Sequence, residues 1–170
     1  MILSRTSSLQ HLVQFARYAV RPHIYIVARR ASSITALLDE LRKSNCEGTY
    51  TTIEKDVSLI RVTSDVVEFI KARETKLDLL FESVGFISFS GRQETAEGLE
   101  PSMTTRCYSR IRAVHGLLPL LNAAASPRVV SILAGGQEGR MNEEGLNLRM
   151  QGVRTSLAGA PTLTRLRENT

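Results

Sequence analysis

Hydrophobic positions along this chain follow two alternating patterns: segments with an apolar residue every three or four positions, and short continuous apolar runs. The first pattern indicates helices with one buried face, and the second indicates strands that are buried on both sides. The helical stripes lie at 9–20, 34–41, 62–70 and 103–124. The strand-like runs lie at 23–28, 50–55, 77–81 and 128–133. About four clear strands that alternate with helices predict an α/β fold with a parallel sheet covered on both faces.

Capping residues refine the ends of these helices. A Thr or Ser at 6–8 can cap the first helix, and Ser33 is predicted to cap the second, which ends near Gly48. The longest stripe, with Pro119 inside it, carries Ile111, Val114, Leu117 and Leu118.

The alternating pattern stops near residue 140. From there to the end of the chain come five arginines, scattered glycines and no strand-like run. The full length of 170 residues suits one domain, which at this size buries about two thirds of its unfolded surface. We therefore expect residues 1–139 to form that domain, and 140–170 to be an irregular or poorly ordered tail.

Composition excludes several classes of protein. With 42% hydrophobic residues the chain is too apolar to be disordered, and its two cysteines exclude a disulfide scaffold or a cysteine-rich zinc module. No apolar run approaches the roughly 20 residues of a membrane-spanning helix, so no membrane association is expected. The net charge of +5 is spread along the chain, aromatic residues make up 5%, and Trp is absent. We therefore expect no nucleic-acid partner either.

The start of the chain is rich in arginine and serine and has no acidic residue before Asp39. This composition is typical of a mitochondrial transit peptide, but the same residues also fit an ordinary first helix packed on a sheet. A core strand at 23–28 follows at once, and a strand that needs the helix for packing would not follow a cleaved leader. The ordinary helix is therefore favoured, and with it a cytoplasmic protein.

Candidate chemistry lies after the strands, because the ligand crevice of a parallel α/β sheet is at the carboxyl ends of its strands. Arg29 and Arg30 follow the first run, where they could bind the 2′-phosphate of NADP or simply be exposed. Asp56 could accept a hydrogen bond from an adenine amino group, cap the next helix near Ser58, or do both. Gly85 could admit a cofactor close to the backbone, or serve a plain turn.

Familiar catalytic sets are missing from the sequence. The three histidines, His11, His23 and His115, lack the spacing of metal ligands, and there is no Gly-x-Ser-x-Gly motif. Neither Cys46 nor Cys107 has a visible activating partner. The glycine-containing turn at 134–139 is not followed by an apolar helix, as a phosphate-binding turn requires. The residues alone predict no catalytic group and no metal site.

Taken in order and spacing, several segments resemble the short-chain dehydrogenase/reductase family, and are most similar to its members from fungal secondary-metabolite pathways. These segments are 21–30, 55–59, 77–85, 116–121 and 128–135. The resemblance covers residues 6–139 and implies an incomplete Rossmann-like, doubly wound parallel sheet. It also implies an NADP-dependent oxidoreductase that acts on a small-molecule carbonyl or alcohol, and association into a homo-oligomer through its long helices.

The resemblance also implies residue roles in the cofactor site. Arg29 or Arg30 would meet the 2′-phosphate of NADP, and Asp56 with Val57 would border the adenine. The stretch from Ser83 to Gly85 would line the cofactor ribose. In this family a Tyr whose pKa is lowered by a nearby Lys is the acid/base, and a Ser binds the substrate oxygen.

Three features depart from the family pattern. Residues 4–10 replace the family's glycine-rich turn without a single glycine, Ala134 stands at the place of the active-site Ser, and no Tyr-x-x-x-Lys motif exists. Two hypotheses follow: an NADP-dependent oxidoreductase related to the family, or a catalytically inactive, truncated Rossmann-like remnant that binds cofactor weakly or not at all. A third hypothesis is that the sequence comes from an incomplete gene model, whose true product has the glycine-rich turn and the Tyr/Lys pair. The sequence predicts no catalytic residue under any of them.

Overall fold

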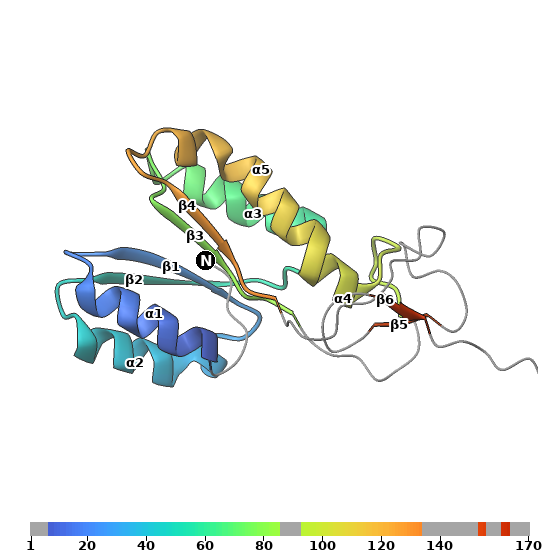
Figure 1. Ribbon diagram of the computed structural model, residues 1–170, viewed down its shortest axis with the longest axis horizontal. Helices are drawn as coiled ribbons and strands as arrows, with labels where there is room; N and C mark the ends of the chain where they lie inside the picture. Colours follow the sequence, from blue (N-terminus) through green and yellow to red (C-terminus); the bar gives the residue numbers. More distant parts are fainter. Residues whose placement is uncertain (1–6, 86–92, 134–152, 156–160, 164–170) are drawn as a thin grey trace, which may run out of the picture.

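The structure, a computed structural model, describes residues 7–85, 93–133, 153–155 and 161–163. The main elements are α1 (Ser7–Tyr18), β1 (His23–Ala28), α2 (Thr35–Ser44), β2 (Thr49–Glu54), α3 (Ile60–Lys71), β3 (Leu79–Glu82), α5 (Ser109–Asn122) and β4 (Arg128–Ser131). Helices α1 and α2 pack on one side of the strands and α3 and α5 on the other (Figure 1), but β4 is largely exposed, with Val129 at 45%, so the prediction that the run at 128–133 is buried on both sides is wrong. Short helical turns precede two of the helices: Ala31–Ile34 before α2, and α4 (Pro101–Met103) with the π-helical turn Thr104–Tyr108 before α5.

The strands pair in parallel as β1 with β2 and as β3 with β4. The first pair runs from His23 opposite Thr49 to Ala28 opposite Glu54. The second pair ends with Glu82 opposite Ser131. Among the described strands no backbone ladder joins β1 to β3. All four strands point the same way, so their carboxyl ends lie at one edge of the molecule (Figure 1).

Strand β1 is buried on both faces, as its continuous apolar sequence predicts. Ile24, Ile26 and Ala28 pack into a cluster with α1 and α2. The residues between them, Tyr25 and Val27, pack into the second cluster, under α3 and α5. Successive side chains of a strand point to opposite faces, so only a strand between two helical layers can bury every one of them.

Helix α1 is held to the end of α2 by a polar side chain as well as by apolar packing. The Asn45 side chain, which follows α2, donates hydrogen bonds to the carbonyl oxygens of Ala16 and Ala19, both at 2.8 Å. Ala16 is in the last turn of α1 and Ala19 directly follows the helix, so no intrahelical donor is left for these carbonyls. The side-chain amide of Asn45, at the C-terminal end of α2, thus supplies hydrogen-bond donors to carbonyl groups at the C-terminal end of α1.

The α/β fold predicted from the sequence is confirmed: β1 has the predicted bounds, and the ends of the other three strands differ from the prediction by at most two residues. One cap is wrong: α2 begins at Thr35, and the Ser33 hydroxyl donates to the carbonyl of Arg30 at 2.6 Å instead of capping the helix. In α5, Leu117 is buried as predicted, but Ile111 and Leu118 are 63% and 45% exposed, and the other apolar residues of the buried face are Ala113, Leu120 and Leu121.

The segment after residue 139, for which the sequence predicts no strand, contains a small hairpin. Its strands β5 (Val153–Thr155) and β6 (Pro161–Leu163) pair antiparallel. The other residues of 140–170 lie outside the described part of the chain. The division into a domain at 1–139 and a tail stays a prediction.

Helix α5 packs closely against Val67 of α3 at Gly116. A Cβ at this position would lie 2.6 Å from Cγ1 of Val67, a β-branched side chain with little freedom to move aside. We expect Gly116→Ala to lower the free energy of unfolding by about 1–2 kcal/mol, because overpacking outweighs the better helix propensity of alanine. Urea denaturation measures this change.

The matched control is His115→Ala, at the neighbouring exposed position of α5, where only helix propensity changes. The double variant Gly116→Ala/Val67→Ala should be more stable than the sum of the two single changes predicts, because it removes the clash. Additive effects would contradict a direct contact between these two residues.

Candidate functional site

The loops after β1 and β2 lie side by side at the carboxyl edge of the sheet. The backbone N–H of Lys55 donates to the carbonyl of Ala28 at 2.9 Å, and the N–H of Ala31 donates to the carboxylate of Glu54 at 3.0 Å. Arg29 and Arg30 stand in the first of these loops, and both are exposed. Their guanidinium groups are therefore accessible to a ligand at this edge.

The loop from β2 into α3 contains Asp56 and Val57. The Asp56 carboxylate accepts a hydrogen bond from the N–H of Ser58 at 2.9 Å, which is a local turn. The helix begins only at Ile60, so Asp56 does not cap it as the sequence suggested. Val57 is buried and belongs to the core cluster under α3 and α5.

The cap of α3 comes from a distant residue that the sequence analysis missed. The Glu97 carboxylate accepts hydrogen bonds from the N–H groups of Ile60 at 2.6 Å and Arg61 at 3.0 Å. A carboxylate is well placed there, because the first N–H groups of a helix lack intrahelical partners and carry partial positive charge. No local signal in the sequence links residue 97 to residue 60.

Ser83 and Gly85 follow β3 at the same edge, where Ser83 is buried and Gly85 is half-buried. A Cβ at Gly85 would meet only the Arg106 side chain, at an ordinary distance of 3.6 Å from Cγ. Its φ lies outside the left-handed region. Among the described residues, neither backbone conformation nor internal packing requires glycine at this position.

The first residues of α5 connect the loops after β2, β3 and β4. The Ser109 hydroxyl donates to the carbonyl of Val57. Arg110, which is 6% exposed, directs its guanidinium group to the ends of β3 and β4. It donates to the carbonyl oxygens of Glu82 (3.2 Å), Val84 (2.6 Å) and Ile132 (2.9 Å) and to the hydroxyl of Ser131.

The turn before α5 is built from hydroxyl side chains that bond to the backbone. Thr104 donates to the carbonyl of Glu100 at 2.9 Å, and Thr105 donates to the carbonyls of Pro101 at 3.0 Å and Ser102 at 3.1 Å. The Glu100 carboxylate accepts from the N–H of Met103 at 2.6 Å. Such side-chain bonds compete with regular helical bonding and accompany the π-helical turn that carries Arg106 toward Gly85.

Glu82 places a carboxyl group inside this site. The residue is 1% exposed, and its Oε1 has no hydrogen-bond partner among the described residues. Burial raises its pKa to about 7, while the nearby Arg110 acts in the opposite direction. Burial prevails because Arg110 gives its N–H groups to carbonyl oxygens. Burial likewise lowers the pKa of Arg110 and of Arg106, and Glu100 partly offsets the effect on Arg106.

None of the four tyrosines, all of which the structure describes, forms the acid/base of the family with a lysine. Tyr25 donates to the Glu74 carboxylate at 2.6 Å, and burial followed by this bond raises its pKa to about 12, opposite to what an acid/base near neutral pH needs. Tyr50 donates to backbone carbonyls at the end of α2, and burial raises its pKa too. Tyr18 is 79% exposed on α1.

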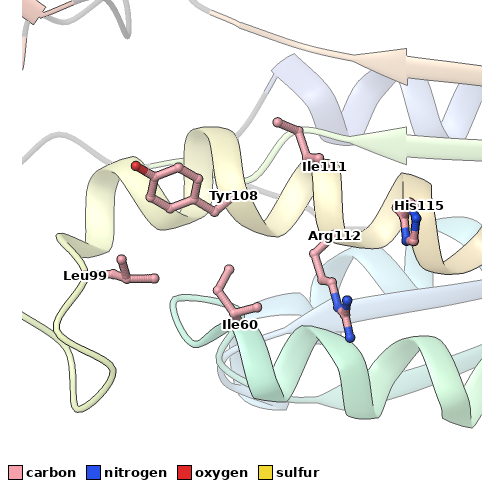
Figure 2. A pocket seen from close by; sticks show the side chains of 6 residues that line it. All are labelled: Ile60, Leu99, Tyr108, Ile111, Arg112 and His115. Atoms are coloured by element: carbon pink, nitrogen blue, oxygen red, sulfur yellow. The ribbon is translucent and has the colours of Figure 1, made fainter. Parts of the chain in front are cut away.

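Tyr108 lines a separate, mostly apolar groove between the start of α3 and α5 (Figure 2). Leu99, Ile60 and Ile111 surround it there, and the Arg112 side chain points across toward α3, where its Nε donates to the Ser64 hydroxyl at 2.9 Å. Ile60 is the first residue of α3 and follows the loop with Asp56 and Val57, so the groove begins next to this loop.

The described residues contain no group of three or more His, Cys, Asp or Glu side chains placed to hold a metal ion. None of the described helices combines the length and apolar character needed to cross a bilayer.

Comparison with known proteins identifies relatives, although no protein-family model matches the chain. An NmrA-like family domain-containing oxidoreductase of Aspergillus sp. is 53% identical over 145 residues, and an oxidoreductase of Emericella nidulans is 41% identical over 138 residues. A short-chain dehydrogenase/reductase of Stachybotrys chartarum is 35% identical over 138 residues. The chain is homologous to fungal oxidoreductases, one of which is a short-chain dehydrogenase/reductase.

The matches cover 84%, 81% and 73% of this chain, but only 43%, 41% and 38% of the three relatives. This chain thus spans about two fifths of the length of these relatives.

Solved structures agree on the fold. An NADH-dependent reductase in complex with NAD has a TM-score of 0.62 at 17% identity, over 78% of this chain and 57% of that one. The Pseudomonas aeruginosa RhlG/NADP complex has a TM-score of 0.57 at 21% identity, over 76% and 52%.

The residues of this chain that the sequence predicts to bind the cofactor follow β1, β2 and β3. These three loops all lie at the carboxyl ends of the strands (Figure 1). The structure adds Glu82, Glu97, Ser109 and Arg110 to the site. Only its place directly after the apolar run 77–81 could have indicated Glu82, as a carboxyl group at the end of a buried strand. The roles proposed for Arg29, Arg30, Asp56, Val57, Ser83 and Gly85 stay predictions. Ala134 lies outside the described residues.

The buried Glu82 carboxyl gives stability a dependence on pH. In the unfolded chain it ionises near 4.5, but in the folded chain only near 7, so folding loses stability as pH rises between these values. Glu82→Gln cannot ionise. Relative to the wild type, we expect this variant to gain up to about 3 kcal/mol between pH 4.5 and pH 8.

Urea denaturation at pH 4.5, 6 and 8 measures the difference between variant and wild type. Glu40→Gln, at an exposed position of α2, is the matched control for the loss of one carboxylate. A difference between Glu82→Gln and the wild type that stays constant from pH 4.5 to 8 would show that burial does not disfavour this carboxylate.

Proposed function

We propose that this chain provides the NADP-binding part of a short-chain dehydrogenase/reductase-type oxidoreductase. The observation that carries the proposal is the pair of exposed arginines, Arg29 and Arg30, directly after β1 at the carboxyl edge of a parallel sheet. Planar guanidinium groups match phosphate oxygens, and ligands of such sheets bind at that edge. The fungal relatives named oxidoreductases support the same function.

The residues at this edge fit a dinucleotide at several points. Arg29 or Arg30 would hold the 2′-phosphate, Asp56 and Val57 would border the adenine, and Ser83 to Gly85 would line the ribose. When bound, the cofactor supplies a hydride for a small-molecule carbonyl or accepts one from an alcohol. The chain's own residues bind and orient it. By the likeness to fungal relatives, the substrate belongs to secondary metabolism.

A second candidate is a protein that binds the nucleotide without turning over a substrate. The tyrosines favour it, because the sequence has no Tyr-x-x-x-Lys motif and two of its tyrosines, Tyr25 and Tyr50, have raised pKa values. Hydride transfer to a carbonyl needs a positioned proton donor as well as a cofactor. The two candidates share the cofactor site and differ in activity. Association through the long helices stays a prediction of the family resemblance.

The arginine pair makes the cofactor site testable by ligand-induced stabilisation. Saturating NADPH should raise the Tm of the purified chain more than NADH does, because only NADPH carries the 2′-phosphate. We expect Arg29→Ala/Arg30→Ala to weaken NADPH binding roughly 10- to 100-fold, as expected for lost charge-assisted hydrogen bonds, and to change NADH binding little.

Arg128→Ala is the matched control, since Arg128 is exposed at the amino end of β4, on the opposite edge of the sheet. Equal losses for NADPH and NADH would remove the 2′-phosphate role of the arginines. A wild-type chain whose Tm responds to neither nucleotide would overturn cofactor binding itself.

A further inference from the structure

Arg110 extends the pairing of β3 and β4 past the point where their backbones stop bonding to each other. The last ladder bond runs from the N–H of Ile132 to the carbonyl of Glu82 at 2.7 Å. Beyond it, Nη2 of Arg110 donates to the carbonyl of Val84 at 2.6 Å and to that of Ile132 at 2.9 Å. One guanidinium nitrogen thereby bridges the two diverging loops.

The second terminal nitrogen of Arg110 holds the strand ends themselves. Nη1 donates to the carbonyl of Glu82 at 3.2 Å and to the hydroxyl of Ser131, the residues that form the last pair of the ladder. Four acceptors from two strands are thus fixed by one side chain. The guanidinium is planar and has donors on a rigid fork, so these bonds fix the loops in direction as well as in distance.

The hydrogen-bond acceptors of Arg110 are neutral groups, although the buried Glu82 carboxyl acts on it electrostatically. Arg110 is 6% exposed, its Nε has no hydrogen-bond partner among the described residues, and its terminal nitrogens go to neutral acceptors. A buried cation held by carbonyl oxygens costs desolvation, which a stabilising role by itself would not favour. Fixing the geometry of the strand-end loops is what this arrangement achieves.

We propose that Arg110 is a positioning residue for the nucleotide: it holds the loops after β3 and β4 in the shape that lines the cofactor crevice. The inference rests on the proposed function, because Ser83 to Gly85 lie within the loop that Arg110 fixes. Arg110 contacts no part of the nucleotide's 2′-phosphate site. It therefore affects NADPH and NADH alike, unlike Arg29 and Arg30.

Two measurements on the full chain test this proposal, with Arg110→Lys as the main variant. Lysine keeps the charge but cannot reach four acceptors with a rigid fork. Hydrogen exchange should become more than tenfold faster in peptides that cover 82–85 and 131–133, and stay unchanged in β2. The Kd values for NADPH and NADH, measured below the unfolding transition by nicotinamide fluorescence, should both rise about tenfold or more.

Arg112→Lys is the matched control, because Arg112 is an exposed neighbour on α5 whose Nε donates to Ser64, on the side away from the crevice. Ser131→Ala is a milder second variant, which removes one of the four acceptors and should weaken both nucleotides a few-fold. It keeps the test open if Arg110→Lys does not fold.

The outcomes separate the inference from the function on which it rests. Unchanged exchange in the two loops, or faster exchange with unchanged affinities, would overturn the positioning role of Arg110. Loss of NADPH binding alone would reassign Arg110 to the 2′-phosphate. A further outcome is a wild-type chain that binds neither nucleotide while hydrogen exchange is still faster in Arg110→Lys. That result would overturn the cofactor function and the nucleotide role of Arg110, and would leave Arg110 a structural role only.

Discussion

Parallel strands that end inside a protein leave backbone carbonyl groups without a ladder partner, and each such group needs a donor if water is excluded. The residues at the start of α5 meet this requirement. Ser109 donates to the loop after β2, and Arg110 donates to the loops after β3 and β4. The position of α5 and the shape of three loops at the carboxyl edge depend on these bonds.

The same bonds explain why polar residues are concentrated at this edge. The hydroxyls before α5 bond to nearby carbonyls, and Glu100 and Glu97 each cap a helical start. Elsewhere the two core clusters are apolar, apart from Tyr25, whose hydroxyl reaches Glu74. A polar, hydrogen-bonded edge over an apolar interior is the arrangement in which loops hold a defined shape without extensive packing.

The strands and most of the helices could be predicted from the sequence because their signals are local. The run at 23–28 has no polar residue after its first, and only a strand between two layers buries such a run completely. The apolar spacing of α3 predicts its buried stripe equally well, since Val66 and Ile70 lie in the core. The positions of Arg29, Asp56 and Gly85 followed from the same reasoning, because residues after parallel strands share one edge.

What the sequence could not indicate are bonds between distant positions. Glu97 caps a helix that begins 37 residues earlier, and Arg110 meets carbonyls 26 and 28 positions before it and one 22 positions after it. Ser33, the obvious local cap, bonds to Arg30 instead. The backbone carbonyls that select Arg110 carry no residue-specific signal, since every residue has one. In the sequence, Arg110 therefore cannot be distinguished from a surface arginine. Only the fold shows that Arg110 is buried and that Arg112, two residues later, is exposed.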